Sequence, residues 1–392
     1  MIVGVPAETY PDERRVALIP AMAPKLTRAG LEVLVEAGAG AQAGYPDSAF
    51  EVQGAQLAAD RNALFSTADV LVYVHGPAAA GADLALLRDG QVVIGLLNPL
   101  GAPEAARELA KRGVTAFALE LVPRISRAQP MDALSSMATV AGYKAALMAA
   151  EFLPKMYPMM ITAAGTITPA RVFVVGAGVA GLQAIVTSRR LGAVVHAYDI
   201  RPVVKEQVES LGARFVELGL ETEGAEGSGG YARAMGEEFY RRQREVMAQV
   251  VAESDVVITT AAVPGSKAPT LITAAMVSGM RPGSIVVDLA AEGGGNCELT
   301  RPRETVQAHG VTIAGPVNLP STIPYHASQM YANNVAAFLG NLFADGQLRL
   351  NLEDPIIHDT LLTHAGEIRN TRVRELLGLP AANAHTAEGS SS

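Results

Sequence analysis

Three glycines near the middle of the chain, Gly176, Gly178 and Gly181, belong to the sequence G-A-G-V-A-G over residues 176–181, together with Ala177 and Val179. They follow an apolar run, RVFVV, and precede a segment with helical periodicity, LQAIVTSRRL. This order predicts a strand, a tight turn and a helix amino terminus, where unpaired N–H groups attract phosphate. The first glycine permits the turn, the second admits a pyrophosphate to the backbone, and the third lets the helix pack against the strand. The pattern therefore predicts a dinucleotide site rather than a purely structural turn.

An acidic residue, Asp199, ends the next apolar run, VVHAYD, 18 residues after Gly181. A carboxylate at this place accepts hydrogen bonds from the ribose hydroxyls of the adenosine half of a dinucleotide. The same charge repels a 2′-phosphate, which favours NAD(H) over NADP(H) as the nucleotide. Ile200 and Arg201 follow directly and are expected to line the site, although the positive charge of Arg201 favours NADP(H).

The composition argues against several other classes of function. The formal net charge is -8 and no basic run occurs, so a nucleic-acid partner is not expected. The single cysteine, Cys297, has no partner for a disulfide, and no Cys/His cluster has metal-ligand spacing, so we expect a buried thiol and no metal. The amino terminus lacks the features of a signal peptide, and glycines or prolines interrupt the long uncharged stretches, which predicts a cytoplasmic protein without membrane helices.

The length of 392 residues exceeds the usual size of one hydrophobic core, which predicts two domains. Short apolar runs alternate with helical segments, and this predicts an α/β fold with two doubly wound parallel-sheet, Rossmann-like domains joined by long helices. The runs are IVGVP, LEVLVE, ADVLVYV, QVVIGLL and VTAFALE in the first domain, and RVFVVGAG, VVHAYD, ARFVEL, DVVITTA, GSIVVDLA and VTIAG in the second. We expect a first domain over residues 1–132 and 329–380, a long connecting helix over 133–165, the nucleotide-binding domain over 166–328 and a disordered tail over 381–392.

Nearly the whole sequence resembles the superfamily of alanine dehydrogenases and transhydrogenase α subunits, through segments such as VGVPAET, DERRVALIPA, GAQAGYPDSAF, VPGSKAPTLIT and DLAAEGGGN. These segments do not separate the members of the superfamily. RISRAQPMDALSS, which begins at Arg124, resembles the motif that lies beside the nicotinamide ring in the NAD(H)-binding component of transhydrogenases, with Pro130 as a departure. The resemblance implies catalytic roles for Arg124, Gln129, Asp132 and Ser135, and cofactor contacts from Arg124, Ile125, Ser126, Arg127 and Ser135.

From the residues alone, Asp132 has a simpler interpretation as the N-cap of the long helix that follows. A second element of the resemblance is the segment 224–244, which implies a mobile lid whose Tyr231 closes over the nucleotide with a catalytic role. Gly230, Gln243 and Ala262 are implied to lie near the cofactor. The alternative for this segment is an exposed loop followed by a charged helix face.

A missing pair of residues separates the members of the superfamily. Alanine dehydrogenases keep a substrate-binding arginine, a lysine and a catalytic histidine, and the matching positions here are Arg15, His75 and Asn98. Deamination of an amino acid needs a general acid/base, and Asn98 cannot titrate. His75 is expected to be packed or hydrogen-bonded rather than catalytic. Hydride exchange between two nicotinamides moves no proton at the reacting carbons, so the absence favours the transhydrogenase.

The resemblance therefore implies the NAD(H)-binding subunit of a proton-translocating transhydrogenase, a homodimer that passes hydride between NADH and NADP⁺ and is inactive without its partners. NADP(H) would be held on a partner subunit, and a membrane-embedded subunit would keep this chain at the cytoplasmic face. Two alternatives stay open: an alanine dehydrogenase-like enzyme, and a non-catalytic NAD(H)-binding module.

Overall fold

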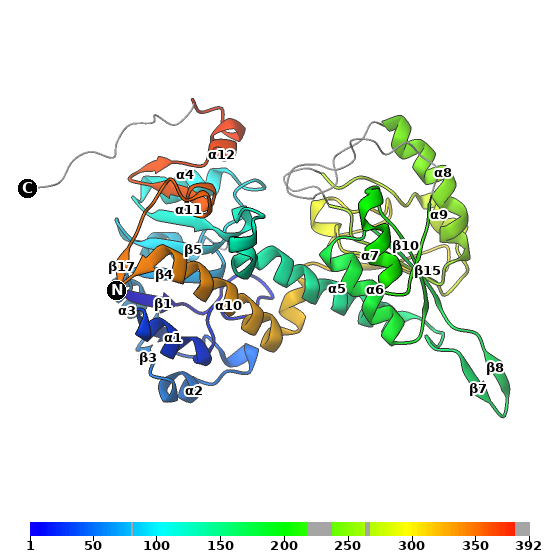
Figure 1. The fold of residues 1–392 in the computed structure, drawn as a ribbon, viewed down its shortest axis with the longest axis horizontal. Helices are drawn as coiled ribbons and strands as arrows, with labels where there is room; N and C mark the ends of the chain where they lie inside the picture. The colour runs from blue at the N-terminus through cyan, green and yellow to red at the C-terminus, as the bar shows by residue number, and fades with distance from the viewer. Residues whose placement is uncertain (80, 218–236, 263–266, 381–392) are drawn as a thin grey trace, which may run out of the picture. The chain divides into compact units, whose positions relative to one another are not determined.

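The computed structural model describes residues 1–79, 81–217, 237–262 and 267–380, and it divides into two compact units (Figure 1). Unit 1 comprises residues 1–137 together with the chain from Ser321 onward, and unit 2 comprises Ala138–Pro320. Each unit is built on its own sheet, so the predicted α/β class with two Rossmann-like parallel sheets is confirmed. Gly230, Tyr231 and the tail over 381–392 lie outside the described residues.

Unit 1 contains an eight-stranded sheet in the order β19-β18-β6-β5-β4-β1-β2-β3. The strands from β6 to β3 in this order are parallel, and β18 and β19 add an antiparallel edge. All five apolar runs predicted for this domain are strands of the sheet. The strand bounds are β1 (Ile2–Val5), β2 (Glu32–Glu36), β3 (Gln56–Ala58), β4 (Val70–His75), β5 (Val92–Leu96), β6 (Thr115–Ala118), β18 (Leu361–His364) and β19 (Glu367–Ile368), with a separate small hairpin of β16 (Phe343–Ala344) and β17 (Gln347–Leu348).

Helices cover both faces of this sheet, because the buried strands present apolar side chains on each face. On one face, side chains of the sheet pack with Leu64 and Phe65 of α3 and Leu109 of α4. On the other face, Phe338 of α10 meets Phe117 of β6 edge to face, with ring centroids 5.6 Å apart. The helix bounds are α1 (Ala23–Arg28), α2 (Asp47–Val52), α3 (Arg61–Thr67), α4 (Glu104–Lys111), α10 (Pro324–Leu342), α11 (Pro355–Thr360) and α12 (Thr371–Leu376), with 3-10 turns that include η1 (Pro20–Met22), η2 (Ala41–Ala43), η3 (Ala82–Leu86), η4 (Leu119–Leu121), η5 (Ser126–Met131) and η9 (Leu319–Thr322).

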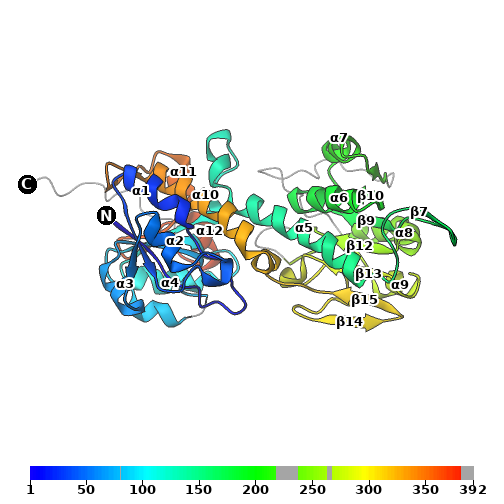
Figure 2. The same cartoon turned by 90° about the horizontal axis from the view of Figure 1, so that it is seen from below.

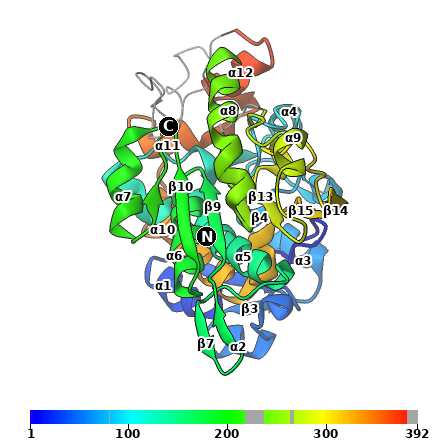
Figure 3. The same cartoon turned by 90° about the vertical axis from the view of Figure 1, so that its right-hand side faces the viewer.

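Unit 2 contains a seven-stranded sheet in the order β11-β10-β9-β12-β13-β15-β14, and Figure 3 shows strands of this sheet side by side across the view. Only β14 is antiparallel, at one edge. The strand order changes direction at β9, so the chain crosses over on both sides of this strand, and ligands of such sheets bind at the carboxyl ends near the switch point. The strand bounds are β9 (Arg171–Val175), β10 (Val194–Tyr198), β11 (Arg214–Phe215), β12 (Val256–Thr259), β13 (Ile285–Asp288), β14 (Thr305–Ala308) and β15 (Val311–Ala314).

Two hydrophobic layers enclose this second sheet. Side chains on one face pack with α5, α6 and α7, and those on the other pack with α8 and α9 (Figure 2). Gly142 of α5 lies so close to the carbonyl oxygen of Ala180 in α6 that a side chain there would collide with it. The helix bounds are α5 (Ala133–Phe152), α6 (Val179–Arg190), α7 (Lys205–Ser210), α8 (Glu237–Glu253) and α9 (Ala274–Ser278), with 3-10 turns η6 (Pro202–Val204) and η8 (Ala291–Gly293).

The prediction of a helix over 133–165 is wrong in its second half. Helix α5 ends at Phe152, because Pro154 and Pro158 follow and proline cannot continue a helical hydrogen-bond ladder. The chain then forms a hairpin of β7 (Met160–Thr162) and β8 (Gly165–Ile167). Figure 1 shows this hairpin extending away from the sheet of unit 2.

Candidate functional site

The glycine turn of unit 2 joins the end of β9 to the start of α6. Gly176 has a φ of 98°, a left-handed conformation that favours glycine. Its carbonyl oxygen accepts a hydrogen bond of 2.9 Å from the Thr260 hydroxyl. A side-chain carbon at Gly181 would collide with the same carbonyl oxygen, so this glycine allows α6 to approach β9. The first and third glycines therefore have the structural purposes that the sequence predicts.

Gly178 differs from the other two glycines because no contact with the described residues requires a glycine at this position. It precedes α6 with extended backbone angles, φ -76° and ψ -168°, which any residue adopts. A side-chain carbon built there meets no atom of the described residues within 4 Å. The open space lies at the amino terminus of a 12-residue helix, where unpaired N–H groups and the helix dipole favour an anion. The turn therefore fits a dinucleotide pyrophosphate, which would need this backbone bare.

The carboxylate of Asp199 lies beside the same turn and is almost fully buried. One of its oxygens, Oδ2, accepts hydrogen bonds from the backbone nitrogen of Ala177 at 2.7 Å and from Arg201 Nη2 at 2.8 Å. The other, Oδ1, accepts from the backbone nitrogen and the Nε of Arg201, both at 2.9 Å. Ile200 between them is buried. The structure thus brings Asp199 to the glycine turn and pairs it with Arg201.

Two residues that the sequence did not predict hold the end of the neighbouring strand β12. Asn296 Oδ1 accepts a hydrogen bond of 3.0 Å from the backbone nitrogen of Ala261, and its Nδ2 donates to the carbonyl oxygen of Ala261 at 2.8 Å. Asp288, which is fully buried, accepts from the Thr259 hydroxyl and from the backbone nitrogen of Cys297, both at 2.9 Å. The sequence feature that could have indicated Asp288 is an acidic residue at the end of an apolar run.

The remaining predicted residues of unit 2 have different environments. Ala262, implied to lie near the cofactor, follows Ala261 and is exposed. Gln243 is buried in α8, and its Nε2 donates a hydrogen bond of 2.8 Å to the hydroxyl of Tyr198, the residue before Asp199. The Gln243 Oε1 is buried and has no hydrogen-bond partner among the described residues. Gln243 thus supports the strand that carries Asp199.

In unit 1, the predicted segment from Arg124 to Gln129 is mostly exposed and forms η5. Arg127 anchors it: the guanidinium pairs with the Asp354 carboxylate and donates a 2.9 Å hydrogen bond to Asn341 Oδ1. This pairing lowers the pKa of Asp354 to about 2. A further anchor is Asn334 of α10, whose Nδ2 donates to the Pro130 carbonyl oxygen at 2.8 Å. The loop is therefore held in place by α10 and by the N-cap of α11.

Asp132 is the N-cap of α5. Its Oδ1 accepts a 2.8 Å hydrogen bond from the backbone nitrogen of Ser135, and its Oδ2 accepts a 2.6 Å hydrogen bond from the Ser135 hydroxyl. These are the contacts of the helix-cap interpretation, and they connect two of the residues to which the resemblance gives catalytic roles. Capping and catalysis are compatible, so the catalytic roles of Arg124, Gln129, Asp132 and Ser135 stay predictions.

The three positions that distinguish alanine dehydrogenases lie at or beside strand ends of unit 1. Arg15 is buried, and its guanidinium forms two hydrogen bonds to Glu13, from Nε at 2.7 Å and from Nη2 at 2.6 Å. His75 Nε2 lies 3.0 Å from Glu13 Oε2, and its ring stacks on Tyr10 with centroids 4.2 Å apart. The expectation of a packed, hydrogen-bonded histidine is confirmed. Asn98 is exposed with a φ of 50°.

Two carboxyl groups close the ends of neighbouring strands in the same unit. Glu8 Oε1 accepts a 2.5 Å hydrogen bond from the backbone nitrogen of Val74, and burial raises the pKa of Glu8 to about 8. Glu120 Oε1 accepts a 2.5 Å hydrogen bond from the backbone nitrogen of Asn98, and burial raises the pKa of Glu120 to about 7. The Glu120 Oε2 is buried without a partner among the described residues.

In unit 2, the Cys297 thiol is buried as expected, which raises its pKa to about 11.

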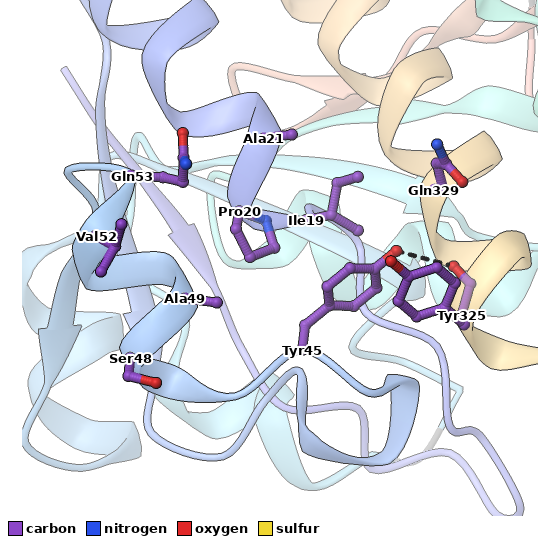
Figure 4. Close-up of a pocket in the computed structure, with 10 residues that line it drawn as sticks. All are labelled: Ile19, Pro20, Ala21, Tyr45, Ser48, Ala49, Val52, Gln53, Tyr325 and Gln329. Atoms are coloured by element: carbon purple, nitrogen blue, oxygen red, sulfur yellow. Dashed lines mark hydrogen bonds between the residues drawn. The ribbon is translucent and has the colours of Figure 1, made fainter.

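An open groove of about 480 Å³ lies elsewhere on unit 1 (Figure 4). Tyr45 and Tyr325 stack beside it with ring centroids 4.7 Å apart, and the Tyr45 hydroxyl donates to the Tyr325 carbonyl oxygen at 3.1 Å. The remaining lining includes Ile19 and Val52. Polar side chains such as Gln53 and Gln329 lie among the apolar ones, and the groove contains none of the predicted site residues.

Two other kinds of feature are missing within the described ranges. No group of His, Cys, Asp or Glu side chains in this part of the chain is arranged to hold a metal ion. Among the helices described, none combines the length and apolar character needed to cross a bilayer.

Comparison with known proteins gives consistent matches over most of the chain. Residues 4–141 match the family domain described as "Alanine dehydrogenase/PNT, N-terminal domain", and residues 145–371 match "Alanine dehydrogenase/PNT, C-terminal domain". A Rhodospirillum rubrum protein, the first part of an NAD(P) transhydrogenase subunit alpha, is 46% identical over 374 residues, which are 94% of this chain and 97% of that protein. The solved transhydrogenase structure from Sinorhizobium meliloti is 44% identical with a TM-score of 0.84, covering 94% of this chain and 100% of that one. Alanine dehydrogenase of Mycobacterium tuberculosis is 31% identical, covering 97% of this chain and 98% of that protein.

Proposed function

We propose a function on one premise: the chain belongs to the alanine dehydrogenase/PNT family. Within that family we assign it as the NAD(H)-binding subunit of a proton-translocating transhydrogenase, which passes hydride between NADH and NADP⁺ held on a partner subunit. The observation that carries the proposal is Gly178, whose backbone is bare at the amino terminus of α6 although no contact with the described residues requires a glycine there. Similarity supports the choice within the family, because the identity to the transhydrogenase subunit is 46% and that to alanine dehydrogenase is 31%.

The proposed NAD(H) site consists of the glycine turn and the residues around Asp199. The N–H groups at the start of α6 bind the pyrophosphate, and Gly178 allows its close approach. Asp199 accepts hydrogen bonds from the adenosine ribose. Ala177, Val179, Ile200 and Ala262 line this edge of the sheet, and the dinucleotide, when bound, supplies or accepts the hydride.

We assign the Arg124–Ser135 segment to positioning the nicotinamide for hydride transfer. Support comes from its anchoring, since Arg127 and Asn334 fix a mostly exposed loop. Hydride transfer needs the reacting carbons about 3 to 3.5 Å apart, so a loop that positions a ring must be rigid. The chain then needs no acid/base residue for the transfer itself, consistent with Asn98 and with His75 bound to Glu13.

The partners in this proposal are a subunit that holds NADP(H) and a membrane-embedded subunit that keeps this chain at the cytoplasmic face. The name of the Rhodospirillum rubrum relative describes the first piece of a divided subunit alpha, and so one component of a multi-subunit enzyme. We also assign a homodimer. Support comes from the β7–β8 hairpin, where Ile161 is 81% exposed and Met159 is 61% exposed, because apolar side chains clustered on a projecting hairpin are typical of an interface.

Reconstitution tests the proposal. The purified chain is first titrated with NADH, and it is then mixed with an NADP⁺-loaded transhydrogenase partner while nucleotide oxidation is followed. We expect the purified chain to bind NADH without transferring hydride, and we expect hydride transfer only in the mixture. NADH binding without transfer to any NADP⁺-loaded partner would favour the non-catalytic binding module, and alanine-dependent reduction of NAD⁺ would favour the dehydrogenase.

A further inference from the structure

The Asp199 carboxylate has no capacity left for another hydrogen bond in this structure. A carboxylate offers about four lone-pair positions, two on each oxygen. Oδ1 accepts two hydrogen bonds from Arg201, and Oδ2 accepts one from Arg201 and one from the backbone nitrogen of Ala177. The side chain of Asp199 is 5% exposed and that of Arg201 is 13% exposed, so solvent does little to weaken their contact.

This arrangement has a consequence for a ribose at the same place. A ribose hydroxyl can donate to Asp199 only if a donor of Arg201 leaves the carboxylate, because the Ala177 nitrogen belongs to the rigid turn. Arg201 therefore competes with the ribose for the same oxygens. The pair is also neutral as a unit, so Asp199 excludes a 2′-phosphate less by its charge than by the hydrogen bonds with which it holds Arg201.

We propose that Arg201 sets the nucleotide preference of unit 2: it weakens NAD(H) binding by occupying Asp199, and it is a 2′-phosphate ligand that Asp199 keeps out of use. A guanidinium is suited to this task because its planar donors match phosphate oxygens as well as carboxylate oxygens. This inference rests on the proposed NAD(H) site at the glycine turn.

The test uses adenosine nucleotides that differ only in the 2′-phosphate. Calorimetric titrations of the full chain with 5′-AMP and 2′,5′-ADP, alongside NADH and NADPH, compare the wild type with Asp199→Asn, Arg201→Gln and the double variant. Asp199→Asn keeps the side-chain shape and the acceptor for Ala177, so folding is preserved. Arg190→Gln is a matched control, because Arg190 is an exposed arginine of α6 that lies outside the proposed site.

We expect Asp199→Asn to bind 2′,5′-ADP and NADPH at least about tenfold more tightly than the wild type, the factor of a single good ionic hydrogen bond. Adding Arg201→Gln should remove that gain, whereas Arg201→Gln alone should bind NADH several-fold more tightly. Arg190→Gln should match the wild type.

Two results would overturn the role of Arg201. One is a gain of NADPH affinity that persists in the double variant, and the other is a folded Asp199→Asn variant whose NADPH affinity equals that of the wild type. Thermal melting of each variant establishes folding, and Asp199→Ser provides the same comparison if the asparagine variant does not fold. The proposed function fails separately: in that case the wild type binds neither NADH nor 5′-AMP.

Discussion

The carbonyl oxygen of Gly176 lies too close to the position that a side-chain carbon of Gly181 would occupy, so a side chain at Gly181 would collide with it. At Gly178, between them, a side-chain carbon would meet no atom of the described residues within 4 Å. The same six-residue motif therefore contains glycines needed for folding and a glycine that folding does not need. Substitutions at Gly181 and Gly178 can therefore distinguish a purely structural turn from a nucleotide-binding site.

We expect Gly178→Ala to fold with unchanged or slightly higher stability, because alanine fits its backbone angles and restricts the unfolded chain. NADH affinity should fall by at least about tenfold, since the methyl group occupies the approach to the helix amino terminus. Gly181→Ala should instead lose about 1 to 3 kcal/mol of unfolding free energy through overpacking. Urea unfolding and NADH titration of both variants check this. Unchanged NADH affinity in Gly178→Ala would remove the glycine turn from the nucleotide site.

The Asp132 cap allows the catalytic prediction to be separated from the structural one. Asp132→Ala should lose about 0.5 to 2 kcal/mol of stability through loss of the N-cap. Asp132→Asn still caps the helix, so its stability should stay near that of the wild type. If the carboxylate positions the nicotinamide, Asp132→Asn should slow hydride transfer on the order of a hundredfold in the reconstituted system, with NADH affinity nearly unchanged.

Gln129→Ala is the companion variant, because Gln129 is exposed in η5 and its removal leaves the Asp132 cap intact. We expect the same slow transfer and normal stability. Normal turnover in Asp132→Asn together with a loss of stability in Asp132→Ala would leave Asp132 with the helix-cap role alone.

Much of the fold could be predicted because buried parallel strands leave a strong signal. The runs that became β1, β4 and β9 are continuous and apolar, and each is bounded by turn residues. The strands β14 and β19 were missed because they are short edge strands with exposed polar residues. The end of α5 was missed because the prediction extended the helix across Pro154.

The site was predictable only where its residues are close in sequence. The glycine turn and Asp199 follow a local spacing, and the Asp132 cap is a local signal as well. Asn296 holds Ala261 from 35 positions away, and no periodicity connects the two residues. The pairing of Arg201 with Asp199 depends on a side-chain rotamer, which the sequence does not specify.

Glu120 predicts a pH dependence of stability. Its pKa is raised to about 7 in the folded protein, from an ordinary value of 4.5, because burial disfavours the charged carboxylate. The folded state therefore holds the proton more tightly, so this group's contribution is complete below pH 4.5 and is lost as pH rises toward about 7. The loss should reach at most about 3 kcal/mol.

Glu120→Gln should remove that part of the pH dependence, because the amide stays neutral and keeps an acceptor for the Asn98 nitrogen. Urea unfolding at mildly acidic and mildly alkaline pH compares it with the exposed control Glu51→Gln. We expect Glu120→Gln to be the more stable protein at alkaline pH only. Parallel pH profiles for all three proteins would show that the Glu120 carboxylate titrates as in the unfolded chain.

The hairpin offers a test of the homodimer. Replacing Ile161 and Met159 by serine removes exposed apolar surface and no buried contact, so each unit should fold normally. We expect sedimentation to show a dimer for the wild type and a larger monomer fraction for the double variant. Val52→Ser is the matched control, because it removes an exposed apolar side chain of unit 1, away from the hairpin of unit 2. This variant should remain dimeric. A wild-type monomer at micromolar concentration would contradict the assignment.

The last prediction concerns the activity that the chain should lack. Dehydrogenation of alanine requires proton transfer as well as hydride transfer, and a positioned acid/base contributes about a hundred to ten thousandfold to such rates. Asn98 has no proton to exchange, and His75 is held by Glu13 and stacked on Tyr10. We therefore expect the isolated chain to bind NADH and to show only traces of alanine-dependent NADH formation at any pH from mildly acidic to alkaline.

Two variants make that absence informative. Asn98→His combined with His75→Lys supplies the residue types that alanine dehydrogenases keep, and a measurable rise in alanine-dependent activity would support the missing acid/base as the cause. Arg15→Lys is the control for real turnover, because it retains a positive charge beside the buried Glu13 carboxylate, whereas truncation would remove that charge. Substantial activity in the wild-type chain that Arg15→Lys abolishes would reverse the assignment, since a substrate carboxylate would then depend on the paired donors of that arginine.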